Sequence, residues 1–125
     1  MITGLHHVSM KCETAKEIDR VRTFYLDVLG CSICREWPGG MMIDTGNGLI
    51  EIFTNGKGNP DKGAVRHFAL LCDDVDETAE RIREAGYEVF IGPQSVVIPS
   101  DPEYPIRMAF CRGPLGEEIE LFREE

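Results

Sequence analysis

The sequence contains an internal repeat, which constrains the possible fold more than any other feature. Residues 5–12 and residues 65–72 share one layout: a histidine, apolar residues at alternate positions, and a cysteine five places after the histidine. Residues 49–53 and 118–122 echo each other in the same way, and each is an apolar segment that contains a glutamate. Alternation of this kind is typical of strands. We therefore predict one structural unit written twice, with a histidine on its first strand and a glutamate on its last.

The first copy, residues 1–55, is predicted to be a β-α-β-β-β module. A capping box formed by Thr14 and Glu17 opens its helix, and Gly30 ends it. The expected elements of this module are a strand at 3–12, a helix at 14–29, and strands at 31–37, 41–45 and 49–54.

The second copy, residues 65–125, follows a polar, glycine-containing linker at residues 55–64. Its expected elements begin with a strand at 65–72 and a helix at 74–85, and continue with strands at 87–91, 106–111 and 117–123. Residues 92–105 contain four prolines. We expect an irregular loop there, with a short apolar stretch at 96–98 that is compatible with a strand. A long loop in a compact domain is often a binding lid, so this segment is expected to shape specificity.

Together the two modules predict an α+β fold. Neither module is large enough to bury its own sheet face, and 125 residues suit one domain with a shared core. We expect a single domain, residues 1–125, in which the paired modules form a curved eight-stranded mixed sheet around a cleft. The sequence allows two arrangements: the modules pair within one chain, or each pairs with the other copy in a partner chain.

Composition excludes several classes of function. The net charge of -9 argues against nucleic acid and anionic membranes as partners. No apolar run approaches the roughly 20 residues of a membrane span, and the N-terminus does not resemble a signal peptide. Five cysteines cannot all pair, which favours free thiols in a reducing compartment. The chain is expected to be cytoplasmic and to act on a small molecule.

The four residues that mark the repeat are the candidate site: His7, Glu51, His67 and Glu120. Two imidazoles and two carboxylates form a mixed nitrogen and oxygen set that suits zinc, nickel, cobalt, iron or manganese. A single strand histidine is more often a hydrogen-bonded structural residue, and a single strand glutamate usually lies on a solvated face. The recurrence of both residues at equivalent places favours a metal site. Glu118 lies on the same face as Glu120, and only the alignment with Glu51 selects Glu120.

The chain resembles the vicinal oxygen chelate superfamily, which includes glyoxalase I, over nearly its whole length. The resemblance implies paired modules with a metal in the cleft, and the four ligands of glyoxalase I match the four residues above. The segments that carry it are Leu5-His6-His7-Val8, Phe24-Tyr25-Leu26-Asp27-Val28-Leu29-Gly30, Leu49-Ile50-Glu51-Ile52, Arg66-His67-Phe68-Ala69-Leu70 and Gly113-Pro114-Leu115-Gly116-Glu117-Glu118-Ile119-Glu120-Leu121.

The resemblance also implies a reaction, that of lactoylglutathione lyase. A hemithioacetal of a 2-oxoaldehyde and a thiol is converted to a hydroxyacyl thioester through an enediolate, which the metal stabilises as a Lewis acid. Glu120 and Glu51 are the candidate bases, and Glu120 is preferred. Lys11 resembles the basic residue that helps to hold glutathione in the bacterial enzymes, although arginine is usual there, and Gly113 replaces a common aspartate. These departures weaken the case for glutathione, and the family also implies a homodimer.

Charged residues elsewhere offer weaker candidates for substrate binding. Lys11 could meet a substrate carboxylate or phosphate, and Arg66, Arg107 and Arg112 are further candidates that fit equally well as solvated surface charges.

Other members of the superfamily supply the alternatives. Acyl-CoA epimerases resemble this chain but typically carry glutamine at the position of Glu51, fosfomycin-modifying enzymes use three ligands, and ring-cleaving dioxygenases are usually longer. A non-catalytic drug-binding protein of the bleomycin resistance type generally lacks the metal ligands. The complete set therefore favours an isomerase.

Overall fold

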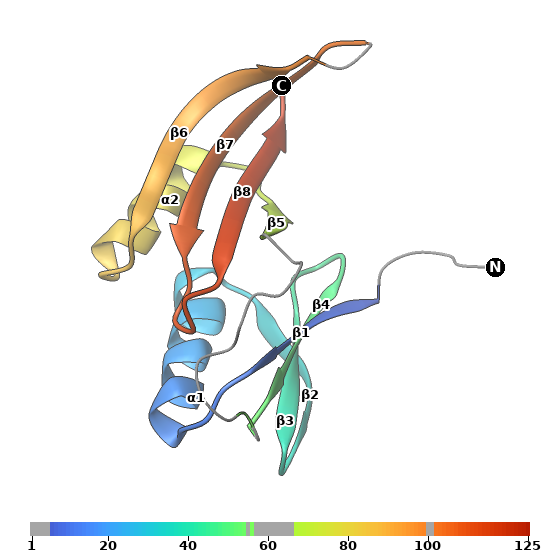
Figure 1. Ribbon diagram of the computed structural model, residues 1–125, viewed down its shortest axis with the longest axis vertical. Helices are drawn as coiled ribbons and strands as arrows, with labels where there is room; N and C mark the ends of the chain where they lie inside the picture. The colour runs from blue at the N-terminus through green and yellow to red at the C-terminus, as the bar shows by residue number, and fades with distance from the viewer. Residues whose placement is uncertain (1–5, 55, 57–66, 100–101) are drawn as a thin grey trace, which may run out of the picture. The chain divides into compact units, whose positions relative to one another are not determined.

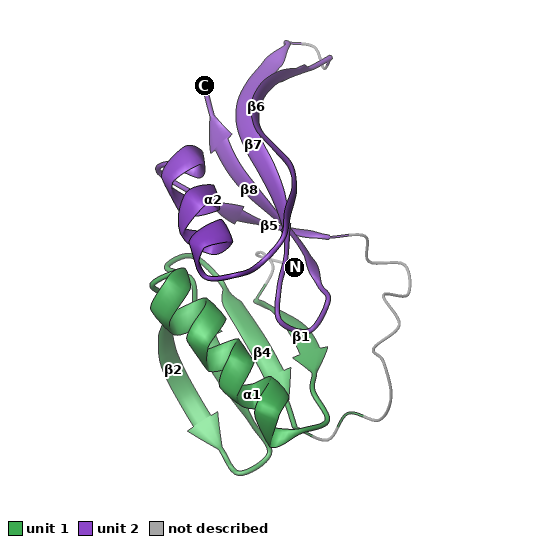
Figure 2. Cartoon of the chain, turned by 90° about the vertical axis from the view of Figure 1, so that its left-hand side faces the viewer, with its two compact units in different colours: residues 1–61 green, residues 62–125 purple. Residues whose placement is uncertain are grey.

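The computed structural model describes residues 6–54, 56, 67–99 and 102–125. The chain separates into two compact units, residues 1–61 and residues 62–125 (Figure 2). The boundary falls within the predicted linker at 55–64, which lies outside the described residues except for Gly56. None of the described helices is long and apolar enough to cross a membrane.

Unit 1 is a four-stranded mixed sheet with one helical segment along one face (Figure 1). The strand order is β1-β4-β3-β2, with β1 parallel to β4 and the other pairs antiparallel. Its elements are β1 (His7–Lys11), α1 (Ala15–Arg22), η1 (Thr23–Val28), β2 (Ser32–Trp37), β3 (Gly40–Asp44) and β4 (Leu49–Phe53).

The helix of unit 1 begins as its sequence predicts and ends differently. The side chain of Thr14 accepts a hydrogen bond from the Glu17 N–H at 3.2 Å, and the Glu17 carboxylate accepts from the Thr14 N–H at 2.9 Å. This reciprocal capping box confirms the predicted start. After Arg22 the helix continues as a π-helical turn, η1, which the apolar spacing did not predict. Gly30 then adopts φ +73°, a left-handed conformation that glycine reaches without steric cost.

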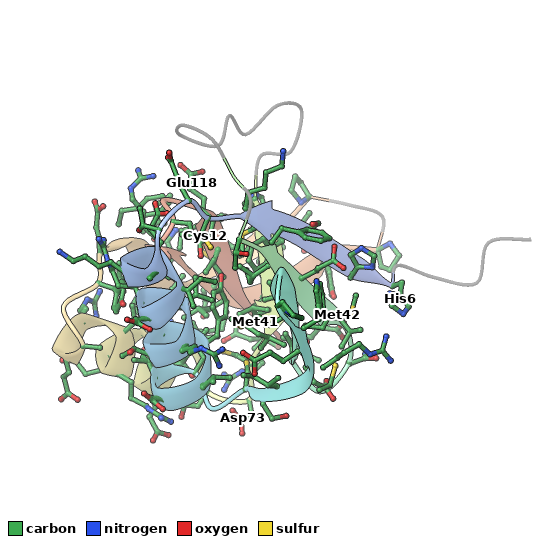
Figure 3. The ribbon with its side chains drawn as sticks, turned by 90° about the horizontal axis from the view of Figure 1, so that it is seen from below. His6, Cys12, Met41, Met42, Asp73 and Glu118 are labelled. Carbon is green, nitrogen blue, oxygen red and sulfur yellow. The ribbon has the colours of Figure 1, made fainter. Side chains whose placement is uncertain are left out.

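The core of unit 1 lies between this helix and one face of its sheet, which we call the helix face. Met41 projects to the helix side of β3, whereas its neighbour Met42 projects to the other side (Figure 3). Alternation along the strands puts every second side chain against the helix. The core side chains, each no more than 2% exposed, are Val21, Phe24, Tyr25, Met41, Ile43, Ile50 and Ile52.

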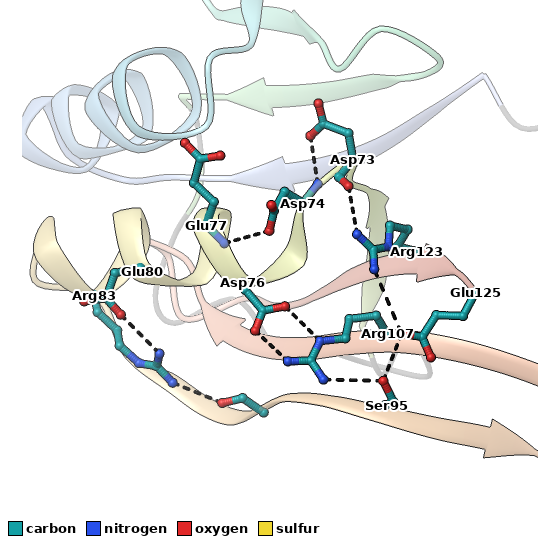
Figure 4. A network of polar contacts seen from close by, with 11 residues as sticks. Asp73, Asp74, Asp76, Glu77, Glu80, Arg83, Ser95, Arg107, Arg123 and Glu125 are labelled. Carbon is teal, nitrogen blue, oxygen red and sulfur yellow. Dashed lines mark hydrogen bonds and ion pairs between the residues drawn. The ribbon is translucent and has the colours of Figure 1, made fainter.

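Unit 2 repeats this arrangement with longer antiparallel strands. Its strand order is β5-β8-β7-β6, again with the first strand parallel to the last. Asp74 caps the helix by accepting a hydrogen bond from the Glu77 N–H at 2.9 Å (Figure 4). The elements are β5 (Phe68–Leu71), α2 (Val75–Glu84), β6 (Val89–Ile98), β7 (Tyr104–Arg112) and β8 (Glu118–Glu124). Its buried hydrophobic residues are Val75, Ala79, Ile82, Ile106, Ala109, Cys111, Ile119 and Leu121.

The expectation of an irregular, lid-like loop is wrong for most of residues 92–105. Residues up to Ile98 belong to β6, which includes the 96–98 stretch that was compatible with a strand, and β7 begins at Tyr104. Residues 100 and 101 lie outside the described residues. Pro93 is accommodated because β6 is an edge strand, where a missing N–H does not break a ladder on both sides. Pro93 lies where the register of β6 shifts between Ile91 and Gln94, which is the kind of bulge that tolerates proline.

The α+β class and the two β-α-β-β-β modules are confirmed. The eight strands are divided between two four-stranded mixed sheets, one in each unit. The registers agree as well: Glu51 is paired with Ser9, two residues after His7, and Glu120 is paired with Ala69, two residues after His67. The repeat seen in the sequence is therefore a repeat of hydrogen-bonding register.

Candidate functional site

In unit 1, His7 and Glu51 meet across the parallel pair of β1 and β4. The distance from His7 Nε2 to Glu51 Oε1 is 3.5 Å. Glu51 is only 8% exposed, on the side of the sheet opposite the helix, which we call the glutamate face. Burying a carboxylate is costly unless it has a charged or hydrogen-bonding partner. The imidazole of His7 is such a partner.

In unit 2, His67 and Glu120 form the equivalent pair. His67 Nε2 lies 3.1 Å from Glu120 Oε2, again on the face opposite the helix. The ring of Phe110 meets the imidazole edge to face, with 5.0 Å between centroids and an interplanar angle of 88°. Phe110 is also the ladder partner of Glu120 on β7. One aromatic side chain therefore packs beside both members of the pair.

Both pairs fit the spacing of two ligands on one divalent cation. Nitrogen and oxygen ligands lie about 2.1 Å from zinc, so two ligands separated by an angle between square and tetrahedral lie about 3.0–3.4 Å apart. The observed separations of 3.5 and 3.1 Å are close to that range. Neutral imidazole and carboxylate are also donors that transition metals accept readily.

Each His–Glu pair supplies two donors. Among the described residues, no group of three or more histidine, cysteine, aspartate or glutamate side chains is placed to hold a metal ion. The candidate metal ligands therefore remain the two pairs.

A second histidine adjoins the first pair. His6 Nδ1 and His7 Nδ1 lie 2.9 Å apart, so one ring donates its Nδ1 proton to the other. If His7 donates, its Nε2, the atom nearer to Glu51, carries a lone pair and can bind a cation. If His6 donates, His7 Nε2 carries a proton instead. His6 therefore influences which tautomer His7 adopts, and it is a site residue that the repeat did not select, because Arg66 occupies the matching position.

Lys11 lies on the glutamate face of the unit 1 sheet. It follows His7 by four residues on β1, which preserves the face, and it is paired with Phe53 of β4. Its side chain is exposed. The structure therefore places Lys11 on the same face as Glu51, as its candidate role in substrate binding requires.

Arg107 lies on the opposite face of its sheet from Glu120. Its guanidinium binds the carboxylate of Asp76 on α2 through two contacts, 2.8 Å from Nε and 2.5 Å from an Nη atom, and an Nη atom reaches Ser95 at 3.4 Å (Figure 4). This ion pair holds the pKa of Asp76 below its usual value. The structure thus gives Arg107 a role in joining the helix to the sheet and does not bring it to the His67–Glu120 pair.

The guanidinium of Arg112, like that of Arg107, is held by carboxylates of its own unit. It forms ion pairs at 3.0 Å with Glu88 and with Glu118, and its guanidinium lies 4.6 Å from the ring centre of Phe90. Arg66, the remaining basic candidate, lies outside the described residues.

Two aromatic side chains on the glutamate faces, Phe110 and Trp37, were not identified from the sequence. Phe53 was expected on the face of Glu51, because it follows Glu51 by two residues in one strand. The same alternation was available for Phe110, which shares a face with Arg112 rather than with the buried Cys111.

Comparison with known proteins agrees with this architecture. The sequence profile of the Glyoxalase/Bleomycin resistance protein/Dioxygenase superfamily matches residues 4–121. No curated protein matches the sequence. Three solved structures, each below 25% identity, share the fold.

The first is described as a glyoxalase family protein from Bacillus anthracis, with 24% identity, a TM-score of 0.77, and coverage of 100% of this chain and 98% of that one. The second is an antibiotic-binding protein from a Streptomyces species, with 22% identity, a TM-score of 0.74 and coverage of 99% and 98%. The third is a lactoylglutathione lyase from Agrobacterium tumefaciens, with 21% identity, a TM-score of 0.65 and coverage of 98% and 94%. Since the profile spans almost the entire chain and the fold agrees, this protein belongs to the glyoxalase/bleomycin resistance protein/dioxygenase superfamily.

Proposed function

We propose that this protein is a metal-dependent, glyoxalase I-like isomerase that acts on the hemithioacetal of a 2-oxoaldehyde and a thiol. The observation that carries the proposal is the duplicated pair: each unit holds one imidazole and one carboxylate, at equivalent registers, with separations of 3.5 and 3.1 Å. An enzyme of this kind needs a cation to polarise neighbouring oxygens and a carboxylate to move a proton between adjacent carbons.

The four side chains have distinct tasks in this proposal. His7 and His67 supply Nε2, and Glu51 and Glu120 supply carboxylate oxygens, to one divalent transition metal such as nickel, zinc, cobalt, iron or manganese. When bound, the metal acts as a Lewis acid on the vicinal oxygens of the substrate. One of the two glutamates also carries the proton, and Glu120 is our preferred base.

The surroundings of the carboxylates support proton transfer. Glu51 is almost fully buried beside Met42, which is itself 8% exposed, and Glu120 is paired with Phe110. Apolar neighbours strengthen the electrostatic interactions of a carboxylate and reduce competition from water. A proton taken from the substrate is then more readily returned to the adjacent carbon.

The decisive experiment measures metal stoichiometry before activity. Protein purified without a metal-affinity tag is analysed for its elements and titrated with nickel, zinc, cobalt and manganese. We expect about one metal per chain if the four residues share an ion. Glu120→Gln should abolish binding, whereas Glu118→Gln on the same strand face is the matched control and should retain it. Two independent metals per chain, or none, would overturn the shared site.

Activity is then measured with methylglyoxal and several thiols, glutathione included, in the presence of each metal. A hydroxyacyl thioester formed only by the metal-loaded protein, and lost in Glu120→Gln, is the expected result. Full activity after complete chelation would contradict the metal-dependent mechanism.

A second candidate function is non-catalytic binding of an aromatic drug. The aromatic side chains of the glutamate faces favour it, as does the fold shared with the Streptomyces antibiotic-binding protein. Binding of such a compound by a protein that takes up no metal would favour this candidate over the isomerase.

We also propose a cytoplasmic homodimer. The five cysteines form no disulfides, as expected in a reducing compartment. Light scattering after size-exclusion chromatography tests the dimer, and a mass of one chain across a range of concentrations would rule it out.

A further inference from the structure

The glutamate face of the unit 1 sheet carries a continuous row of side chains that the metal proposal does not use. Lys11 is paired with Phe53, Phe53 with Gly40, and Gly40 with Trp37, so the row crosses all four strands. We call these four residues the aromatic row.

Gly40 allows the two rings of this row to meet. A Cβ atom at Gly40 would lie 2.7 Å from Cζ2 of Trp37, so the indole occupies the space that a side chain would fill. The indole and the ring of Phe53 meet edge to face, with centroids 5.9 Å apart and planes at 71°. The absence of a side chain at residue 40 thus creates an aromatic pair above the sheet.

This aromatic pair is not part of the hydrophobic core. Phe24 and Tyr25, the core aromatics of unit 1, are 0% exposed and lie with the helix. Trp37 and Phe53 lie on the other face and remain partly exposed. Partly exposed aromatic rings stack favourably on planar ligands, because they combine a large apolar area with few rotatable bonds.

The row lies beside the glutamate of the His7–Glu51 pair. Phe53 follows Glu51 by two residues on the same strand face, a distance of about 7 Å along the strand. A ligand with its reacting oxygens at Glu51 would therefore place a substituent one ring length away over Phe53 and Trp37. Lys11 lies at the other end of the row and is exposed.

The cation at the end of the row has no counterpart in unit 2. The register position that matches Lys11 is occupied by Leu71, which is 78% exposed. In unit 2, Arg112 also lies beside an aromatic ring, that of Phe90, but its guanidinium is ion-paired with Glu88 and Glu118. In a chain with a net charge of -9, the ammonium of Lys11 gives the aromatic row a preference for an anion.

We propose that the aromatic row binds the non-reacting part of the ligand, and that this part is a planar aromatic group with a negatively charged substituent. The planes of Trp37 and Phe53 lie at 71° to each other, so the planar group stacks on one ring and meets the other edge to face. The Lys11 ammonium pairs with the anion. The assignment of this group to a substrate rests on the proposed isomerase function, whereas the binding itself requires neither metal nor catalysis.

Calorimetric titration with naphthoate tests the binding on the full chain, both as purified and after chelation. We expect binding in both states, together with a change in the emission of Trp37, the only tryptophan in the chain. Cyclohexanecarboxylate, which has the charge without the planar ring, and naphthalenemethanol, which has the ring without the charge, should each bind about tenfold more weakly. Failure of naphthoate to bind, or equal binding of all three compounds, would overturn the proposal.

Variants assign the binding to the row. Trp37→Leu and Phe53→Leu should each weaken naphthoate binding about tenfold, and Phe122→Leu, the counterpart of Phe53 in unit 2, should leave it unchanged. Lys11→Gln should weaken naphthoate but not naphthalenemethanol, and Lys16→Gln on α1 is its matched control. Thermal unfolding checks that each variant is folded. Unchanged naphthoate affinity in Lys11→Gln and in folded Phe53→Leu would contradict the site.

The substrate assignment is tested separately. The hemithioacetal of carboxyphenylglyoxal should be converted with a higher kcat/KM than that of methylglyoxal, and Trp37→Leu should remove this preference. Naphthoate binding with no turnover of either compound would leave the site standing and refute the isomerase. Turnover of both compounds at equal rates, with no naphthoate binding, would refute the site alone.

Discussion

The two units share the same hydrogen-bonding register but differ in the surroundings of the His–Glu pair. Glu51 is paired with Met42 in unit 1, and Glu120 is paired with Phe110 in unit 2. The antiparallel strands are also longer in unit 2, with ten and nine residues in β6 and β7 against six and five in β2 and β3. The duplicated feature is the pair itself, and its neighbours have diverged. The His–Glu pair is therefore a feature of both units, whereas the residues around it are particular to each unit.

The aromatic row also differs between the two units. Positions equivalent to Lys11, Phe53 and Trp37 are occupied in unit 2 by Leu71, Phe122 and Gln94. Only the central aromatic residue is retained. We therefore propose that both units supply metal ligands and that unit 1 selects the ligand.

The largest expected effect is a loss of stability when the core residue that follows either glutamate is truncated. Ile52 and Leu121 are 0% and 1% exposed. Substitution of either by alanine leaves a cavity, so Ile52→Ala and Leu121→Ala should each lower the free energy of unfolding by about 2–5 kcal/mol. Urea denaturation measures both. Leu71→Ala, at an exposed position, is the control and should have little effect; a similar loss there would contradict the assignment of the core.

A smaller effect, on metal affinity, is expected at His6, which precedes His7 where Arg66 precedes His67. His6→Leu removes the hydrogen-bonding partner of His7 Nδ1 and should weaken nickel binding about tenfold, because groups that orient a metal-binding histidine typically contribute that much. His6→Asn, which keeps an acceptor, should restore part of the affinity. Calorimetry provides the measurement. Equal affinity in wild type and His6→Leu would show that His6 does not orient the site.

The two helix caps should contribute equally although their chemistry differs. Thr14→Ala and Asp74→Ala each leave an N–H at the helix start without its side-chain acceptor, and each should cost about 1 kcal/mol. Thermal unfolding compares them. Loss of more than about 2 kcal/mol at either position would indicate that the residue does more than cap its helix.

The smallest effect is a difference in acid sensitivity. The pKa of Asp76 is lowered in the folded state, chiefly by its hydrogen bond to Arg107. Its stabilising contribution is therefore present above the unfolded pKa of about 3.9 and is lost as the pH falls through the folded value. Asp76→Asn should lower Tm slightly at neutral pH and flatten the decline in acid. The exposed Asp19→Asn is the control, and identical pH profiles for both variants would contradict the Asp76–Arg107 contribution.

Much of the fold could be predicted because the repeat and the strand alternation are local signals. His7, Glu51, His67 and Glu120 were selected from the sequence repeat, and the structure brings them together as two pairs, one in each unit. The continuation of β6 beyond Ile91 was not predicted because proline is usually read as a strand breaker, whereas an edge strand with a bulge tolerates it. The π-helical turn was missed because α-helical and π-helical spacing differ too little over six residues.

Side-chain partners were harder to predict than faces. Arg107 is held by Asp76 of the helix, a partner that is distant in the sequence. The face on which Arg107 lies could have been inferred, since residues two and four positions later, Ala109 and Cys111, are buried on that same face. The role of Gly40 depends on the position of an indole three residues earlier, which no sequence pattern specifies.

The parallel pairing of the first and last strands has a consequence for the order of folding. β1 pairs with β4 and β5 with β8, so each histidine meets its glutamate only when the final strand of its module has docked. Such non-local contacts carry a large loop-closure cost and tend to form late. A cation held by these residues binds the folded chain and not the unfolded one, so its binding energy adds to the stability of the finished modules. A bound cation would thus stabilise a module only after its last strand has paired, and it would not stabilise a partly synthesised module.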